Sequence, residues 1–123
     1  MERRDHHAEL LYDTAIGSIR SGIRAAVRRG RHLLYRANET ELMLQMTPDR
    51  RPAHVRLVGQ VLEDGTPVIG AGITLQGPVE VSGHTTDADG EFQVGELPTG
   101  SYSLGLKTPT GRVSVAPLAV STE

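Results

Sequence analysis

Apolar and polar residues alternate along most of the second half of the chain, from about residue 54 to residue 121. A period of two places one side of a strand in a core and the other side in water. The runs are short, and turn residues separate them, which predicts a small antiparallel β-sandwich. The apolar positions of these runs are Val55, Leu57, Val61, Ile73, Leu75, Val79, Val81, Phe92, Val94, Tyr102, Leu104, Leu106, Val113 and Val115.

A different spacing marks the first part of the chain, about residues 5–29. Apolar residues recur there at intervals of three and four, which predicts an amphipathic α-helix with one apolar stripe. Asp5 is the expected N-cap, and Gly30 is the expected stop after the last turn. The stripe consists of Tyr12, Ile16, Ile19, Ile23, Ala26 and Val27.

The region between these parts predicts a hairpin, or else two strands in different sheets. Two apolar-rich runs flank Asn38 and Glu39, and residues 47–52 contain two prolines that are typical of an exposed linker. We therefore expect three segments. Residues 1–30 form a basic amphipathic helix, residues 31–53 a hairpin or edge strands with a linker, and residues 54–121 the sandwich.

Four turn motifs follow one another in the third segment. They are residues 59–65 with Asp64-Gly65, residues 67–71 (Pro-Val-Ile-Gly-Ala), residues 86–92 (Thr-Asp-Ala-Asp-Gly-Glu-Phe) and residues 97–102 (Leu-Pro-Thr-Gly-Ser-Tyr). In this order and spacing they resemble the carboxypeptidase regulatory-like domain, a transthyretin-like member of the immunoglobulin-like sandwiches. The resemblance implies an accessory module that is not an enzyme. It covers about half of the chain.

Composition limits the core and the chemistry. Aromatic residues are only 3% of the chain, so we expect a core of Val, Ile, Leu and Ala in which Phe92 and Tyr102 are the large members. The absence of cysteine excludes disulfides and a thiolate zinc site. No run approaches the ~20 apolar residues of a membrane span, and none has the length of a signal peptide, so a cytoplasmic location is expected.

The charge is distributed unevenly. Residues 1–56 carry eleven arginines and seven acids, a balance of 11 − 7 = +4, whereas residues 57–123 carry Lys107 and Arg112 against eight acids, 2 − 8 = −6. Such a split can hold the two halves together, or it can face two partners.

No arrangement of residues predicts catalysis or a bound cofactor. Residues 87–91 resemble a fragment of a calcium loop, but a hairpin turn explains them better, because no glutamate lies at the distant ligand position. No histidine lies three or four residues from another, and neither a nucleophile elbow nor a phosphate loop is present. We therefore expect no enzyme activity, no metal, no cofactor and no small-molecule substrate. The histidines are His6, His7, His32, His54 and His84.

The best functional lead in the sequence is the predicted helix. An arginine ridge at spacing four runs beside the apolar stripe and has no acid three or four residues away. The stripe can pack on its own sandwich, or it can dock a protein partner or a second copy. The candidate contact residues are Ile16, Ile19, Arg20, Ile23, Arg24, Val27 and Arg28.

The function expected from the sequence is a non-catalytic protein-interaction module with an adaptor or regulatory role. The alternative is binding of nucleic acid or an anionic membrane through the arginine-rich helix. Nucleic acid is the less favoured partner, because the net charge is −2 and Tyr35 is the only nearby aromatic residue that could stack on a base.

Overall fold

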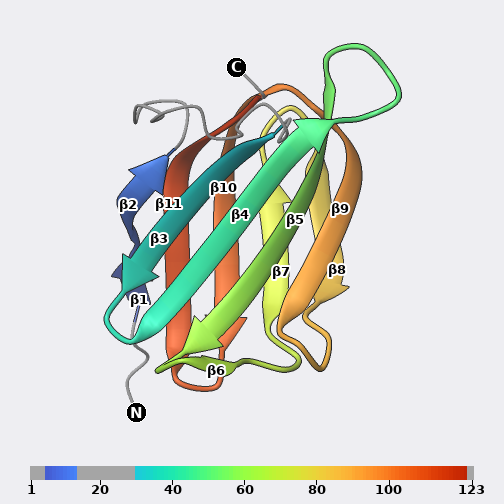
Figure 1. Ribbon diagram of the computed structural model, residues 1–123. Coiled ribbons are helices and arrows are strands. Elements are labelled where there is room, and N and C mark those ends of the chain that lie inside the picture. The colour runs from blue at the N-terminus through green and yellow to red at the C-terminus, as the bar shows by residue number, and fades with distance from the viewer. Residues whose placement is uncertain (1–4, 14–29, 122–123) are drawn as a thin grey trace, which may run out of the picture.

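The protein is an all-β sandwich of two sheets (Figure 1). The computed structural model describes residues 5–13 and 30–121. The first sheet has five strands in the order β1-β11-β10-β7-β8. Their bounds are Asp5–His7 for β1, Gly111–Val120 for β11, Gly100–Thr108 for β10, Gly72–Gln76 for β7 and Glu80–Thr85 for β8.

The second sheet has the order β2-β3-β4-β5-β6, and β9 also pairs with β5. Every strand pair of the described residues is antiparallel except β1 with β11, which run parallel. The predicted all-β fold is thereby confirmed. The bounds are Glu9–Asp13 for β2, Arg31–Ala37 for β3, Thr40–Pro48 for β4, His54–Glu63 for β5, Thr66–Pro67 for β6 and Glu91–Pro98 for β9.

The core lies between the inner faces of the two sheets, where alternate residues of each strand meet. Leucine and valine supply most of it. Phe92 and Tyr102 are buried, as the sequence predicts. The Tyr102 hydroxyl donates a hydrogen bond to the carbonyl of Pro98 (2.7 Å), so this buried polar group has a partner close to the start of its own strand.

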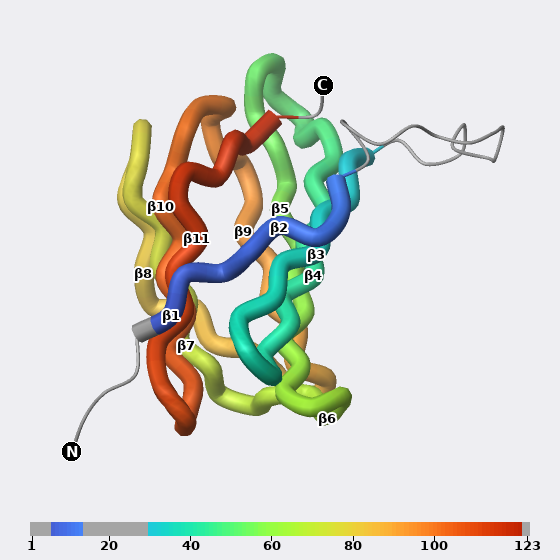
Figure 2. Tube along the Cα trace, turned by 90° about the vertical axis from the view of Figure 1, so that its left-hand side faces the viewer, coloured from blue at the N-terminus to red at the C-terminus, as the bar shows by residue number. Residues whose placement is uncertain are grey.

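The predicted helix is wrong over residues 5–13, which form β1 and β2. These two strands lie along one open edge of the sandwich. The chain pairs first with β11 and then crosses to pair with β3 (Figure 2). The amide of Ala8 donates to the carbonyl of Ser114 (2.9 Å) at the crossing. Asp5 is therefore a strand residue and not an N-cap. Residues 14–29, the rest of the predicted helix, lie outside the described residues.

Gly30 has a role that the helical interpretation did not contain. A Cβ atom at this position would lie 2.6 Å from the carbonyl oxygen of Met46 and 2.8 Å from the side chain of Thr47. Glycine therefore permits the chain to enter β3 in close contact with β4.

Residues 31–48 form a hairpin within one sheet, the first of the two arrangements that the sequence allowed. β3 and β4 pair along their length, and Asn38 at the turn has φ = 58°, a conformation that asparagine tolerates. β4 also pairs with β5 over nine residues, from Thr40 with Glu63 to Pro48 with Val55. Residues 49–53 thus connect two paired strands and do not separate two domains.

The single phenylalanine is packed against a glycine in the neighbouring strand. Phe92 and Gly59 are register partners on β9 and β5, and a Cβ atom at position 59 would lie 2.3 Å from the ring. The contact allows a large ring to fill a core that otherwise consists mainly of aliphatic side chains.

We expect Phe92→Ala to destabilise the protein by about 3–5 kcal/mol, because a buried ring is replaced by a cavity. Gly59→Ala should cost about 1–3 kcal/mol through overpacking against the ring. The double variant should lose less than the sum of the two, because the added methyl group partly fills the space that the ring leaves. Denaturant unfolding measures all three. Additive losses would contradict this packing.

Candidate functional site

The structure does not place the seven candidate contact residues of the predicted helix. Ile16, Ile19, Arg20, Ile23, Arg24, Val27 and Arg28 all lie outside the described residues. Both ends of the segment that carries them are described, however. The segment follows the end of β2 and precedes the start of β3, which are neighbours in one sheet.

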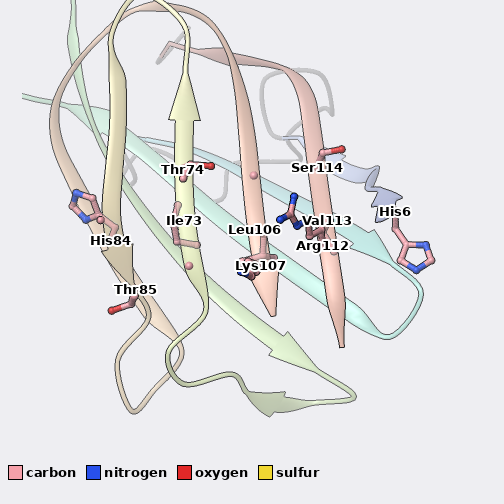
Figure 3. Close-up of a pocket in the computed structure, with 13 residues that line it drawn as sticks. His6, Ile73, Thr74, His84, Thr85, Leu106, Lys107, Arg112, Val113 and Ser114 are labelled. Atoms are coloured by element: carbon pink, nitrogen blue, oxygen red, sulfur yellow. The ribbon is translucent and has the colours of Figure 1, made fainter. Parts of the chain in front are cut away.

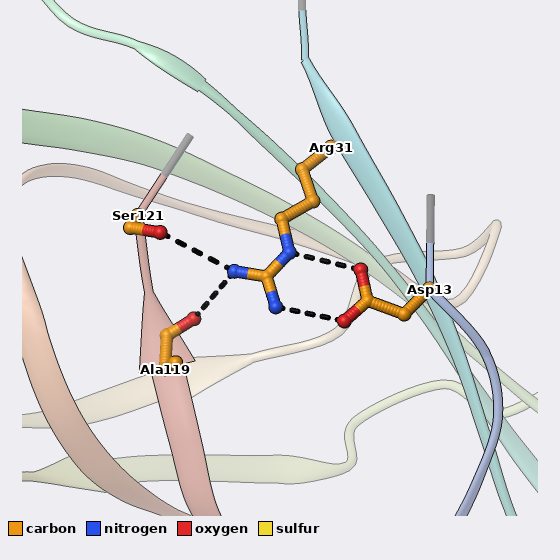
Figure 4. Close-up of polar contacts among 4 residues, drawn as sticks. All are labelled: Asp13, Arg31, Ala119 and Ser121. Carbon is orange, nitrogen blue, oxygen red and sulfur yellow. Dashed lines mark hydrogen bonds and ion pairs between the residues drawn. The ribbon is translucent and has the colours of Figure 1, made fainter. Parts of the chain in front are cut away.

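A buried ion pair joins these two ends. Arg31 Nε donates to Asp13 Oδ1 (2.9 Å), and Arg31 Nη2 donates to Asp13 Oδ2 (2.8 Å), so the pairing is bidentate (Figure 4). The exposed fractions are 9% for Arg31 and 6% for Asp13. The hydrogen bond to Asp13 raises the pKa of Arg31, against the opposing effect of burial.

Arg31 also reaches the other sheet. Its Nη1 donates to the carbonyl of Ala119 (3.0 Å) and to Ser121 Oγ (3.4 Å), at the end of β11. One guanidinium group therefore connects β2, β3 and β11. It fixes the positions at which residues 14–29 leave and rejoin the sandwich.

Apolar side chains are exposed beside this ion pair, on the outer face of the second sheet. Tyr12, Leu34 and Met43 are register partners across β2, β3 and β4, and they form one row. Tyr12 is 53% exposed and Met43 is 37% exposed. Leu10 and Leu11 are also exposed on β2 and continue this surface around the edge of the sheet, where Leu10 pairs with the buried Tyr35 and so lies on the core-facing side of the edge. We call these five residues the apolar row.

Polar residues border the apolar row on both sides. In the neighbouring row on one side, Arg36 Nη2 donates to Glu41 Oε2 (3.0 Å). In the row on the other side, His32 and Gln45 are register partners. An apolar patch with a polar rim is typical of a protein-binding surface.

The sequence contained a signal for this patch that the helical period obscured. Leu10 and Leu11 are consecutive and did not fit the helical stripe, and Met43 was assigned only to a hairpin. Two adjacent leucines followed by Tyr12 are typical of an edge strand that is apolar on both sides. The outward orientation of Met43 could be recognised only from the pairing of β4 with β3 and β5.

The acidic residues 87–91 form a tight turn, but the predicted hairpin is wrong, because the strands on either side, β8 and β9, lie in different sheets. Asp87 Oδ1 accepts hydrogen bonds from the amides of Asp89 and Glu91 (2.9 Å each), and Gly90 has φ = 74°. The Asp87 carboxylate thus closes the turn. Within residues 5–13 and 30–121, no group of three or more metal-binding side chains lies close enough to hold an ion.

Another carboxylate orders the loop between β4 and β5. Asp49 Oδ2 accepts from the amide of Glu96 (2.6 Å), and Asp49 Oδ1 accepts from the amide of Arg50 (2.8 Å). These two hydrogen bonds lower the pKa of Asp49, with the bond from Glu96 as the larger cause. Glu96 and Ala53 have positive φ angles of 51° and 61°, so the backbone here is held in an uncommon conformation.

The part of the chain that the structure describes contains no helix long and apolar enough to span a membrane. No protein-family model matches this chain, no curated protein is detectably similar to it, and no solved structure matches it. The site is therefore interpreted from its own geometry.

We expect Asp13→Ala to cost about 3–5 kcal/mol of folding free energy, because it leaves the buried Arg31 charge without its carboxylate. The double variant Asp13→Ala/Arg31→Met should recover part of that loss. Glu41→Ala, which breaks the exposed pair with Arg36, should cost at most about 1 kcal/mol. Denaturant unfolding of the full chain provides the measurement, and equal losses for Asp13→Ala and Glu41→Ala would contradict a buried clamp.

The lowered pKa of Asp49 predicts an acid-dependent stability. Its hydrogen bonds are present above the unfolded pKa and are lost as the pH falls through the lower folded pKa, below about pH 4. We therefore expect the melting temperature of the parent to decline in this range more steeply than that of Asp49→Asn. Parallel declines would show that other carboxylates account for the acid sensitivity.

Proposed function

We propose that the protein is a non-catalytic protein-interaction module that docks a protein partner through the outer face of its second sheet. The observation that carries the proposal is the apolar row on adjacent strands, bordered by polar residues. Four of its members, Leu10, Leu11, Tyr12 and Met43, are exposed, and Leu34 is half-buried. Burial of such a row by a partner removes apolar surface from water, which is the main favourable term in protein association.

Side chains supply the contact in this proposal, not the backbone of the sheet edge. β2 is an edge strand, and an edge strand can accept a further strand. However, the register between β2 and β3 shifts between Leu10 and Tyr12, which places a bulge at Leu11. A bulge twists an edge and interrupts regular pairing. The expected partner therefore presents an apolar surface of its own.

In this proposal, the segment from residue 14 to residue 29 remains a second contact segment, as the sequence predicts. It begins directly after Asp13, at the end of the apolar row, and the buried ion pair holds both of its ends. Its candidate contacts, with Ile19 as the central one, come from the sequence alone. The arginines among them would orient the encounter more than supply the affinity.

Three finer assignments belong to the same proposal and rest on the sequence alone. They are membership of the carboxypeptidase regulatory-like family with its transthyretin-like topology, the adaptor role and the cytoplasmic location. An accessory module of that family is compatible with a surface that binds a protein.

We expect Tyr12→Glu and Met43→Glu each to abolish binding of the protein partner. Each substitution places a charge in the apolar row, and partner binding would desolvate this charge without a counter-charge. The matched control is Val79→Glu, since Val79 is 38% exposed, close to the 37% of Met43, and lies before β8 of the other sheet. The full chain carries a tag, and the co-purified proteins are compared among the four proteins by quantitative mass spectrometry.

Light scattering on a sizing column shows whether the partner is a second copy, and thermal melting shows that each variant is folded. A protein that the parent and Val79→Glu recover but both row variants lose supports the proposal. Recovery of the same proteins by all four would overturn it, and so would loss of binding after nuclease treatment alone.

A further inference from the structure

A groove of about 670 Å³ lies on the outer face of the first sheet, away from the apolar row (Figure 3). It crosses β11, β10, β7 and β8, and His6 and His84 lie at its opposite sides. Its size is within the usual range of sites for small molecules, about 300–1,000 Å³.

Small residues form the floor of the groove. Thr74, Gly105 and Ser114 are register partners on β7, β10 and β11, so they make one row across the sheet. A Cβ atom at Gly105 would lie 2.8 Å from Thr74 Oγ1. Glycine therefore keeps this part of the sheet surface low and leaves the hydroxyl of Thr74 accessible.

Two cations stand in the next row. Gly72, Lys107 and Arg112 are register partners, and Lys107 and Arg112 flank the turn between β10 and β11. They are the only lysine or arginine residues after position 56, in a part of the chain that carries eight acids. Both side chains are exposed.

Like charges at directly opposed positions destabilise a strand pair. None of the ion pairs among the described side chains involves Lys107 or Arg112. Lys107 and Arg112 therefore leave this row of the described sheet with an excess positive charge. An anion bound between the two cations would remove this unfavourable arrangement.

We propose that this groove binds a small phosphate monoester of a sugar or polyol, with its phosphate between Lys107 and Arg112. The planar guanidinium group suits two phosphate oxygens, and the ammonium group adds a point charge. The two cations match the charge of a phosphate monoester, about −1.5 to −2 at pH 7. The hydroxyls of Thr74 and Ser114 can exchange hydrogen bonds with hydroxyls of the ligand.

The lining favours a sugar or polyol over a nucleotide. Apart from the rings of the two histidines, the residues that line the groove offer no aromatic surface on which a base could stack. This inference goes beyond the protein-docking role and differs from the expectation, drawn from the sequence, that no small molecule binds. The two sites lie on different sheets, so each can fail without the other.

Nuclear magnetic resonance titration of the full chain tests the proposal, with inorganic phosphate, glucose 6-phosphate, glucose and glucuronate as probes. We expect saturable shifts of the amides of Lys107, Arg112 and Ser114 with inorganic phosphate, and tighter binding of glucose 6-phosphate. Glucose should give no shifts, and glucuronate should bind more weakly because its carboxylate carries a single charge.

Lys107→Gln and Arg112→Gln should each weaken the binding of glucose 6-phosphate by about tenfold or more, because each removes a charge-assisted hydrogen bond. The matched control is Arg50→Gln, which removes an exposed arginine from the loop that joins β4 to β5 and should leave the affinity unchanged. Amide spectra of the free variants show whether each is folded.

Absence of saturable shifts with both phosphate probes would overturn the proposal. So would equal affinities in the parent and the two groove variants, which would indicate unspecific binding. Glucuronate binding more tightly than glucose 6-phosphate would assign the groove to carboxylates and refute the phosphate site.

Discussion

The buried pairing of Arg31 with Asp13 is the contact on which the arrangement of the N-terminal strands depends. Three strands from both sheets meet at this guanidinium group, because Arg31 also donates to Ala119 at the end of β11. Burial of two charges has a desolvation cost that their attraction only partly returns. The benefit of the pair is therefore positional, since in this register of β2 the arginine contacts the carboxylate and the carbonyl together.

The strand pattern after residue 54 could be read from the sequence because each strand has one buried and one exposed side. Alternation alone places Phe92 and Tyr102 in the core, and the turn residues around Gly90 mark where the chain reverses. Local signals were sufficient there. β7 with β8 and β10 with β11 are antiparallel neighbours joined by short turns, which local signals can indicate, whereas the pairing of β5 with β9 and of β7 with β10 joins distant segments.

Residues 5–13 could not be predicted in the same way, because their partners are distant in sequence. β1 pairs with β11, more than one hundred positions later, and no local period reveals such a pairing. The helical interpretation depended on spacings counted through residues 14–29, and within the described residues only Tyr12 belonged to that stripe.

The two cations of the groove could be located in part from the sequence, since Lys107 and Arg112 stand at equal distances from the centre of a Thr-Pro-Thr-Gly turn. Their place beside Gly105 and Thr74 required the pairing of β10 with β7.

The parallel pairing of β1 with β11 also determines how the sandwich responds to mechanical force. The chain enters β1 at one end of the sandwich and leaves β11 at the other (Figure 1). Tension between the two termini therefore acts along these strands in opposite directions and loads their hydrogen bonds in shear, all at once. Strands pulled apart from one end would lose the bonds one after another. The geometry thus gives the sandwich resistance to stretching along the same edge at which its first strands cross between the sheets.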